Sequence, residues 1–99
     1  MRLTQEEIEA IRSAVRTHFG EDARVLLFGS RTDDSKRGGD IDLLVECSLN
    51  ARRANHAKLN ALTDIQRRIG ERKIDMVPAT AQGDTREIVS RARTEGVPL

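Results

Sequence analysis

The sequence predicts an α/β fold in which a small mixed sheet of three or four strands is flanked by helices. Two observations predict it. Apolar residues repeat at helical spacing in long segments, and three short apolar runs lie between those segments. The resulting order, helix–strand–strand–helix–strand–helix, is typical of helices packed on one short sheet. A chain of 99 residues has room for one core, so residues 1–99 are expected to form a single domain.

Composition excludes several classes of protein. The formal charge is +1 and the chain has no Trp or Tyr, so neither a strong basic field nor a base-stacking surface indicates direct nucleic acid binding. The single cysteine excludes an internal disulfide and fits a reducing compartment. The first residues lack the apolar run of a signal peptide, and no segment approaches membrane-spanning length. A cytoplasmic protein with no membrane partner is therefore expected.

The first predicted element is an amphipathic helix over residues 4–19. Thr4 and Glu7 have the spacing of a capping box, and Gly20 supplies the C-terminal stop. Its apolar residues repeat at helical intervals at Ile8, Ile11, Val15 and Phe19.

Two strands are predicted next, at ARVLLFG (23–29) and DIDLLVE (40–46). Ten residues separate Gly29 from Asp40. A parallel crossover usually needs a dozen or more, so these two strands are expected to be antiparallel.

A second long helix is predicted over residues 50–70, with Leu59, Leu62, Ile65 and Ile69 on one stripe. The third strand, KIDMVPA (73–79), is ended by proline, and its direction is left open. A last helix is predicted from Asp84 to Gly96. Basic residues gather near the second helix: Arg52, Arg53, Lys58, Arg67, Arg68, Arg72 and Lys73. A solvated surface is the ordinary interpretation of this basic face, and a docking face for an acidic partner or RNA is the alternative.

Acidic residues interrupt the second and third apolar runs. Side chains alternate along a strand, so Asp40 and Asp42 lie on one face while Ile41 and Leu43 lie on the other. If the third strand adjoins the second at roughly 4.8 Å, Asp75 brings a third carboxylate to the same surface. A divalent cation would relieve their mutual repulsion. The alternative left open is that these acids end their strands and face solvent.

Gly29 and Ser30 follow the first strand where a short helical turn could begin. Glycine allows the backbone to lie close to a ligand, and free amides with a serine hydroxyl can hold phosphate oxygens. Arg31 adds a cation in the same place. Alone, Gly-Ser after a strand is only a turn, but nine residues separate Ser30 from Asp40. Phosphates held by this loop could bridge to cations held by the aspartates, as two-metal nucleotidyl transfer requires.

Together, LFGSR, DIDLLVE and KIDMV resemble the motifs of the minimal nucleotidyltransferases of the DNA polymerase beta-like superfamily. The resemblance covers nearly the whole chain, including its closing segment REIVSRARTEGVPL. It implies a nucleotidyltransferase-like fold in which Gly29 and Ser30, beside Arg31, bind the triphosphate of ATP. It also implies that Asp40 and Asp42 hold two magnesium ions (Mg²⁺) and that Asp75 completes the catalytic metal site.

Such proteins are similar to the antitoxin halves of bacterial and archaeal toxin–antitoxin pairs. Their partner is a helical HEPN ribonuclease, which is silenced when AMP is transferred to a tyrosine near its active site. The resemblance therefore implies a protein adenylyltransferase that transfers AMP from ATP to a hydroxyl of a partner HEPN-type toxin protein.

Two other functions are considered. One is a catalytically inactive antitoxin that neutralises the toxin by binding alone, and the other is a small RNA-binding or regulatory α/β domain. Intact Ser30, Asp40, Asp42 and Asp75 favour the enzyme, because a steric module needs none of them. His18, His56 and Cys47 are assigned no catalytic role, since none has a partner at a suitable spacing.

Overall fold

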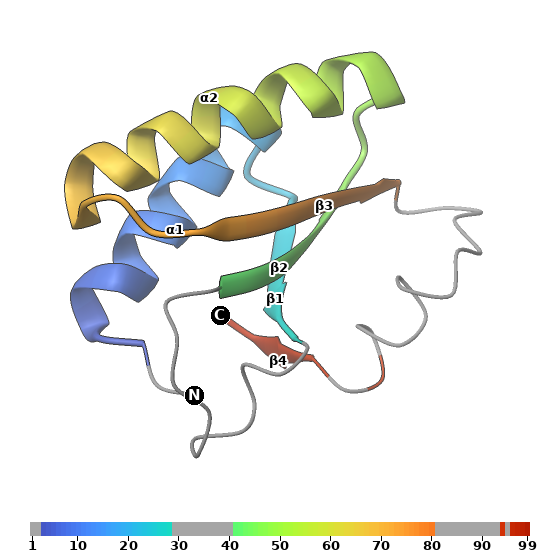
Figure 1. Ribbon diagram of the computed structural model, residues 1–99. Coiled ribbons are helices and arrows are strands. Elements are labelled where there is room, and N and C mark those ends of the chain that lie inside the picture. The colour runs from blue at the N-terminus through green and yellow to red at the C-terminus, as the bar shows by residue number, and fades with distance from the viewer. Residues whose placement is uncertain (1–2, 29–40, 81–93, 95) are drawn as a thin grey trace.

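The computed structural model describes residues 3–28, 41–80, 94 and 96–99, and it shows one sheet with two helices on one of its faces (Figure 1). The sheet order is β3-β2-β1-β4. Strand β1 pairs antiparallel with β2 and β4, and β2 pairs parallel with β3. The predicted mixed α/β fold is thus confirmed, together with its antiparallel first pair. The elements are α1 (Gln5–Phe19), β1 (Arg24–Leu27), β2 (Ile41–Cys47), α2 (Ala51–Ile69), β3 (Ile74–Thr80) and β4 (Val97–Pro98).

Helix α1 begins with the capping box that the sequence predicts. The Thr4 hydroxyl accepts a hydrogen bond from the Glu7 amide at 3.1 Å, and the Glu7 carboxylate accepts one from the Thr4 amide at 2.8 Å. Two backbone donors at the helix N-terminus are thereby satisfied. The helix ends at Gly20, whose φ of 113° lies in the region that favours glycine.

Helix α2 packs the predicted stripe against the core except at one residue, since Leu62 and Ile69 are partly buried there. Ile65 is fully buried, but Leu59 is 57% exposed, so its place on the buried stripe was wrongly predicted. Residues on an α-helix are about 100° apart, so Leu59 lies roughly 200° around the helix from Ala57 and from Ala61. Those two alanines and Ala54 occupy the buried line instead.

Strand β3 continues past the proline that was predicted to end it, because Pro78 lies within Ile74–Thr80. Proline is tolerated there because β3 is an edge strand, whose outward backbone groups need no partner. Beyond Gly96 the chain forms β4, which supplies the fourth strand. The predicted last helix lies outside the described residues except for Thr94, which is helical, and Gly96, which is not.

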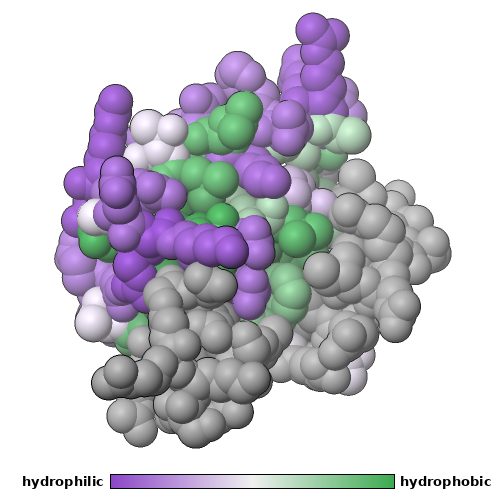
Figure 2. Space-filling view, viewed as in Figure 1, coloured by the Kyte–Doolittle hydropathy of each residue, from purple (hydrophilic) through white to green (hydrophobic). Residues whose placement is uncertain are grey.

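The main core lies between the sheet and the two helices. It joins Ile11 and Phe19 of α1 and Ile65 of α2 to Leu43 and Val45 of β2. In the view of Figure 2, the surface is hydrophilic over the helix layer and hydrophobic across the middle, where β3 forms one edge of the sheet. Neither helix in the described part of the chain is long and apolar enough to cross a lipid bilayer.

Candidate active site

Asp42 on β2 and Asp75 on β3 are direct register partners in the parallel pair. Paired strands lie about 4.8 Å apart, so the two residues adjoin. Ile41 and Leu43 are buried in the core beneath the helices, and so is Met76. Because side chains alternate, Asp42 and Asp75 belong to the opposite face, away from α1 and α2. The two strands that carry the predicted acids are therefore neighbours, and their register brings these two carboxylates together.

The other predicted site residues, Gly29, Ser30, Arg31 and Asp40, lie outside the described residues. Both described ends of their segment lie beside the acidic pair. The Phe28 amide donates to the Asp42 carbonyl at 3.0 Å, and the Ile41 amide donates to the Lys73 carbonyl at 2.9 Å. The segment thus begins next to Asp42. It ends next to Lys73, which lies two residues before Asp75 in the chain.

An apolar cluster lies on the same face as the acidic pair. Leu26, Leu44 and Ala79 are buried there, with Phe28 and Val77 packed against them. Leu44 follows Asp42 by two positions and Val77 follows Asp75 by two, so the alternation along each strand places them on the acidic face. This cluster was not predicted from the sequence, although the alternation of side chains along β2 and β3 already places Leu44 and Val77 on the face of the two acids. This cluster packs side chains of β1, β2 and β3 together on the face that carries the two carboxylates.

The acidic pair suits a hard divalent cation. Asp42 is half-buried and Asp75 is exposed, and carboxylate oxygens are the ligands that Mg²⁺ prefers in proteins. Two anionic groups this close repel one another, and a bound cation would remove that repulsion. The residues that the structure describes contain no cluster of three or more His, Cys, Asp or Glu side chains. The third predicted ligand, Asp40, is outside them.

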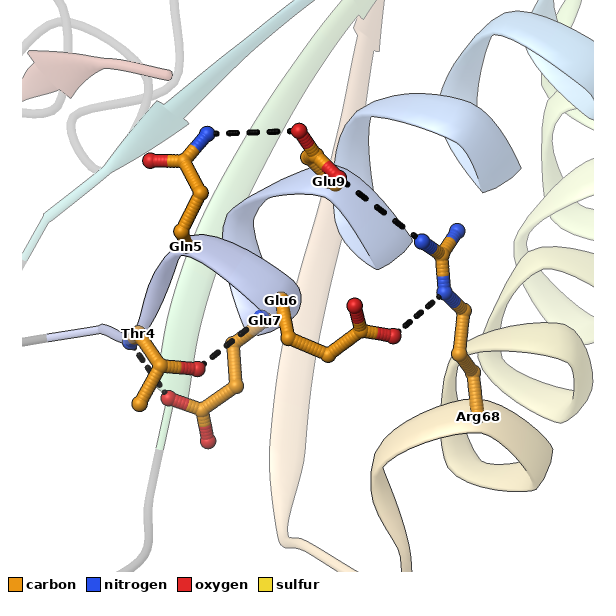
Figure 3. Close-up of polar contacts among 6 residues, drawn as sticks. All are labelled: Thr4, Gln5, Glu6, Glu7, Glu9 and Arg68. Carbon is orange, nitrogen blue, oxygen red and sulfur yellow. Dashed lines mark hydrogen bonds and ion pairs between the residues drawn. The ribbon is translucent and has the colours of Figure 1, made fainter.

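Several charged residues of the helices have structural partners instead. Arg68 of α2 donates to Glu6 at 2.8 Å and lies 3.9 Å from Glu9 (Figure 3). Arg72 pairs with Glu7, and it follows the end of α2. Part of the predicted basic face is therefore neutralised by α1.

Two of the residues that were assigned no catalytic role have structural surroundings. His18 Nε2 lies 2.6 Å from the Asp64 carboxylate, which joins the end of α1 to α2. Cys47 is 2% exposed, as expected of a structural thiol.

Burial raises the pKa of Glu7, but the Thr4 amide and the Arg72 guanidinium outweigh it, so the pKa of Glu7 is lowered.

Comparison with known proteins identifies the family to which the chain belongs. No match was found among curated proteins. A family model described as "Nucleotidyltransferase domain" matches residues 8–95, which include both strands of the acidic pair and the Gly-Ser segment between β1 and β2. Proteins of this family transfer nucleotidyl groups and generally use divalent metal ions. The chain belongs to the nucleotidyltransferase domain family.

Proposed function

We propose that this chain transfers AMP from ATP to a tyrosine hydroxyl of a HEPN-type toxin protein and thereby acts as its antitoxin. The observation that carries the proposal is the register pairing of Asp42 with Asp75, beside the two ends of segment 29–40. The family match favours nucleotidyl transfer as the class of reaction. We also propose that residues 1–99 act as one domain in the cytoplasm.

The donor set fits the two Mg²⁺ ions that the proposal includes. Asp42 and Asp75 would hold them together with Asp40, and oxygens of the ATP phosphates would complete their coordination. When bound, the ions would neutralise phosphate charge and make a nearby hydroxyl more acidic.

The chain's own residues bind the nucleotide and move the proton in this proposal. Gly29 and Ser30 would hold the triphosphate through backbone amides and the serine hydroxyl, with Arg31 as an additional cation. Asp75 would accept the proton of the attacking tyrosine hydroxyl. The tyrosine oxygen forms a bond to the α-phosphorus while the bond from that phosphorus to the bridging oxygen breaks, and pyrophosphate leaves. Because this chain contains no tyrosine, the acceptor tyrosine belongs to another polypeptide.

The test uses ATP labelled at either the α- or the γ-phosphate, with magnesium and the HEPN-type protein encoded beside this chain's gene. Label from the α-phosphate is expected on the HEPN-type protein, and none from the γ-phosphate. Asp42→Asn should abolish the transfer, because a neutral amide binds magnesium poorly. The matched control is Glu21→Gln, which removes an exposed carboxylate from the turn between α1 and β1.

Other outcomes would contradict the proposal. Label transferred from the γ-phosphate would indicate a kinase. Equal neutralisation of the toxin by the wild type and by Asp42→Asn, with no transfer by either, would indicate the catalytically inactive antitoxin instead.

A further inference from the structure

A groove of about 740 Å³ lies between the C-terminal end of α1 and the N-terminal half of α2. Among the α2 residues that line it, Arg52, His56 and Leu59 follow one another at intervals of four and three positions, so these three lie on one side of the helix. We call this surface the α2 groove, and its principal lining residues are His18, Leu49, Arg52, Arg53, His56 and Leu59.

The arginines of the α2 groove differ from those at the other end of the helix. Arg68 is paired with Glu6 and Glu9, whereas Arg52 and Arg53 are exposed and have no carboxylate partner among the described residues. No acidic residue occupies the first turn of α2. Uncompensated positive charge therefore remains at this end of the helix, where the helix dipole is also positive.

The lining of the α2 groove is uniform in sign. Its described residues include no carboxylate. The groove beside β1 is different, because it combines arginines with Glu21 and Glu46. Of these two surfaces, only the α2 groove combines arginines with a lining that includes no carboxylate among the described residues.

Leu59 gives the α2 groove an apolar centre. It is 57% exposed and lies two turns along the helix from Arg52. A single exposed leucine is ordinary on a protein surface. Here it lines the same groove as the unpaired cations, and an apolar residue with charged residues around it is the pattern of an interface with an apolar centre and a charged rim.

We propose that the α2 groove docks an acidic amphipathic helix of another protein. An apolar side chain of that helix would pack on Leu59, and its carboxylates would pair with Arg52 and Arg53. Helices bind grooves through anchors spaced three to four residues apart, which matches the spacing of Arg52, His56 and Leu59 on α2. The described lining contains no Phe, Tyr or Trp, whose large rings form the usual stacking surfaces for single strands, so an acidic protein is favoured over single-stranded RNA.

The α2 groove is separate from the acidic pair. Helix α2 begins beyond the C-terminal end of β2, while Asp42 lies near the start of that strand and on the opposite face of the sheet (Figure 1). A docked helix would leave Asp42 and Asp75 accessible, and docking does not depend on the proposed transfer reaction.

The test is an NMR titration of the isotopically labelled full chain with three synthetic probes. The first is a helical peptide with glutamates flanking a leucine stripe, the second has the same composition rearranged so that no leucine stripe forms, and the third is a 12-nucleotide polyuridine RNA. The first peptide is expected to bind more tightly than the others and to shift the amides of Arg52, His56 and Leu59.

Charge reversal should identify the contacts. The double change Arg52→Glu with Arg53→Glu should weaken binding of the first peptide at least about tenfold, because like charges then face one another. Acidic residues are favourable at a helix N-terminus, so the variant is expected to fold. Leu59→Gln should weaken binding as well. The control is Arg67→Glu, an exposed charge reversal outside the groove on the same helix, which should leave binding unchanged.

Four results would overturn the proposal: equal binding of the rearranged peptide, tighter binding of the RNA, amide shifts confined to residues outside the groove, or no binding of the first peptide at concentrations up to about 1 mM.

Discussion

At the scale of single residues, the two described acids of the site have the same charge but different surroundings. Asp42 is half-buried in an interior strand, and the Phe28 amide donates to its carbonyl. Asp75 is exposed on the edge strand β3. The proposed function accordingly gives Asp42 a role in holding magnesium–ATP and Asp75 a role beside the attacking hydroxyl.

Asp75→Asn is predicted to retain most of the affinity for magnesium–ATP while losing the transfer step. Ser30, Asp40 and Asp42 remain in this variant to bind the nucleotide, but the proposed proton acceptor is gone, which corresponds to a rate loss of about 10²–10⁴-fold. Calorimetry of nucleotide binding, paired with the α-label transfer assay, measures the two effects separately. Equal loss of binding and transfer, or loss of neither, would contradict this division of roles.

At the scale of elements, α1 and α2 are joined by ion pairs of unequal burial. The Arg68 pairs lie at the surface, with about half of each side chain exposed, and such pairs usually contribute little to stability. The Glu7–Arg72 pair is more enclosed, with side chains 13% and 27% exposed. Glu7 is also part of the capping box of α1, so one carboxylate both starts a helix and holds the segment after α2.

Stability is predicted to depend on pH through Glu7. The pKa of Glu7 is lowered from 4.5, so its ionised form stabilises the fold above that pH, and the contribution is lost as pH falls through the lowered pKa. Chemical denaturation of the wild type and of Glu7→Gln should show a stability difference at neutral pH. That difference should disappear in acid, where the wild-type side chain is also neutral.

The control for this titration is Glu21→Gln, because Glu21 is exposed and lies in the turn after α1. It should be as stable as the wild type at neutral pH, where Glu7→Gln is less stable. A constant difference between Glu7→Gln and the wild type down to about pH 3, well below the ordinary glutamate pKa, would contradict the assignment.

At the scale of the whole molecule, one helix layer covers one face of the sheet, and the acidic pair lies on the other. The stability of the domain therefore depends on how α2 packs into the shared core. Two apolar residues of α2 differ sharply in this respect, since Ile65 is fully buried and Leu59 is largely exposed.

Ile65→Ala is predicted to lower the free energy of unfolding by about 2–5 kcal/mol, because it removes buried methyl and methylene groups and leaves a cavity. Leu59→Ala is the matched control and should change stability by less than about 0.5 kcal/mol. Urea denaturation of both variants measures the difference. Similar losses in the two variants would contradict the packing of α2 described here.

The proposed antitoxin role predicts a stable complex with an all-helical protein encoded beside this chain's gene. Under this proposal the acceptor tyrosine comes from another polypeptide, because this chain has none. Co-expression followed by affinity purification and size-exclusion chromatography tests the complex. Failure to recover such a protein would contradict the antitoxin role while leaving the nucleotidyltransferase family unaffected.

The sequence alone determined the features that depend on nearby residues. The capping box of α1 follows from the spacing of Thr4 and Glu7, and the antiparallel first pair follows from the short connection between β1 and β2. Strand alternation was sufficient to separate Asp42 from the core residues on either side of it. The family could also be recognised from motif spacing, whereas Gly29, Ser30, Arg31 and Asp40 remain sequence predictions for the site.

Tertiary structure decided the features that depend on segments far apart in the chain. The parallel register that pairs Asp42 with Asp75 joins residues separated by the whole of α2, and local pattern left that direction open. The exposure of Leu59 and the pairing of Arg68 with Glu6 likewise depend on which face of α2 meets its neighbours. Helical periodicity placed Ile65 on the buried side correctly, but it did not show that buried alanines, and not Leu59, continue that side toward the N-terminus of α2.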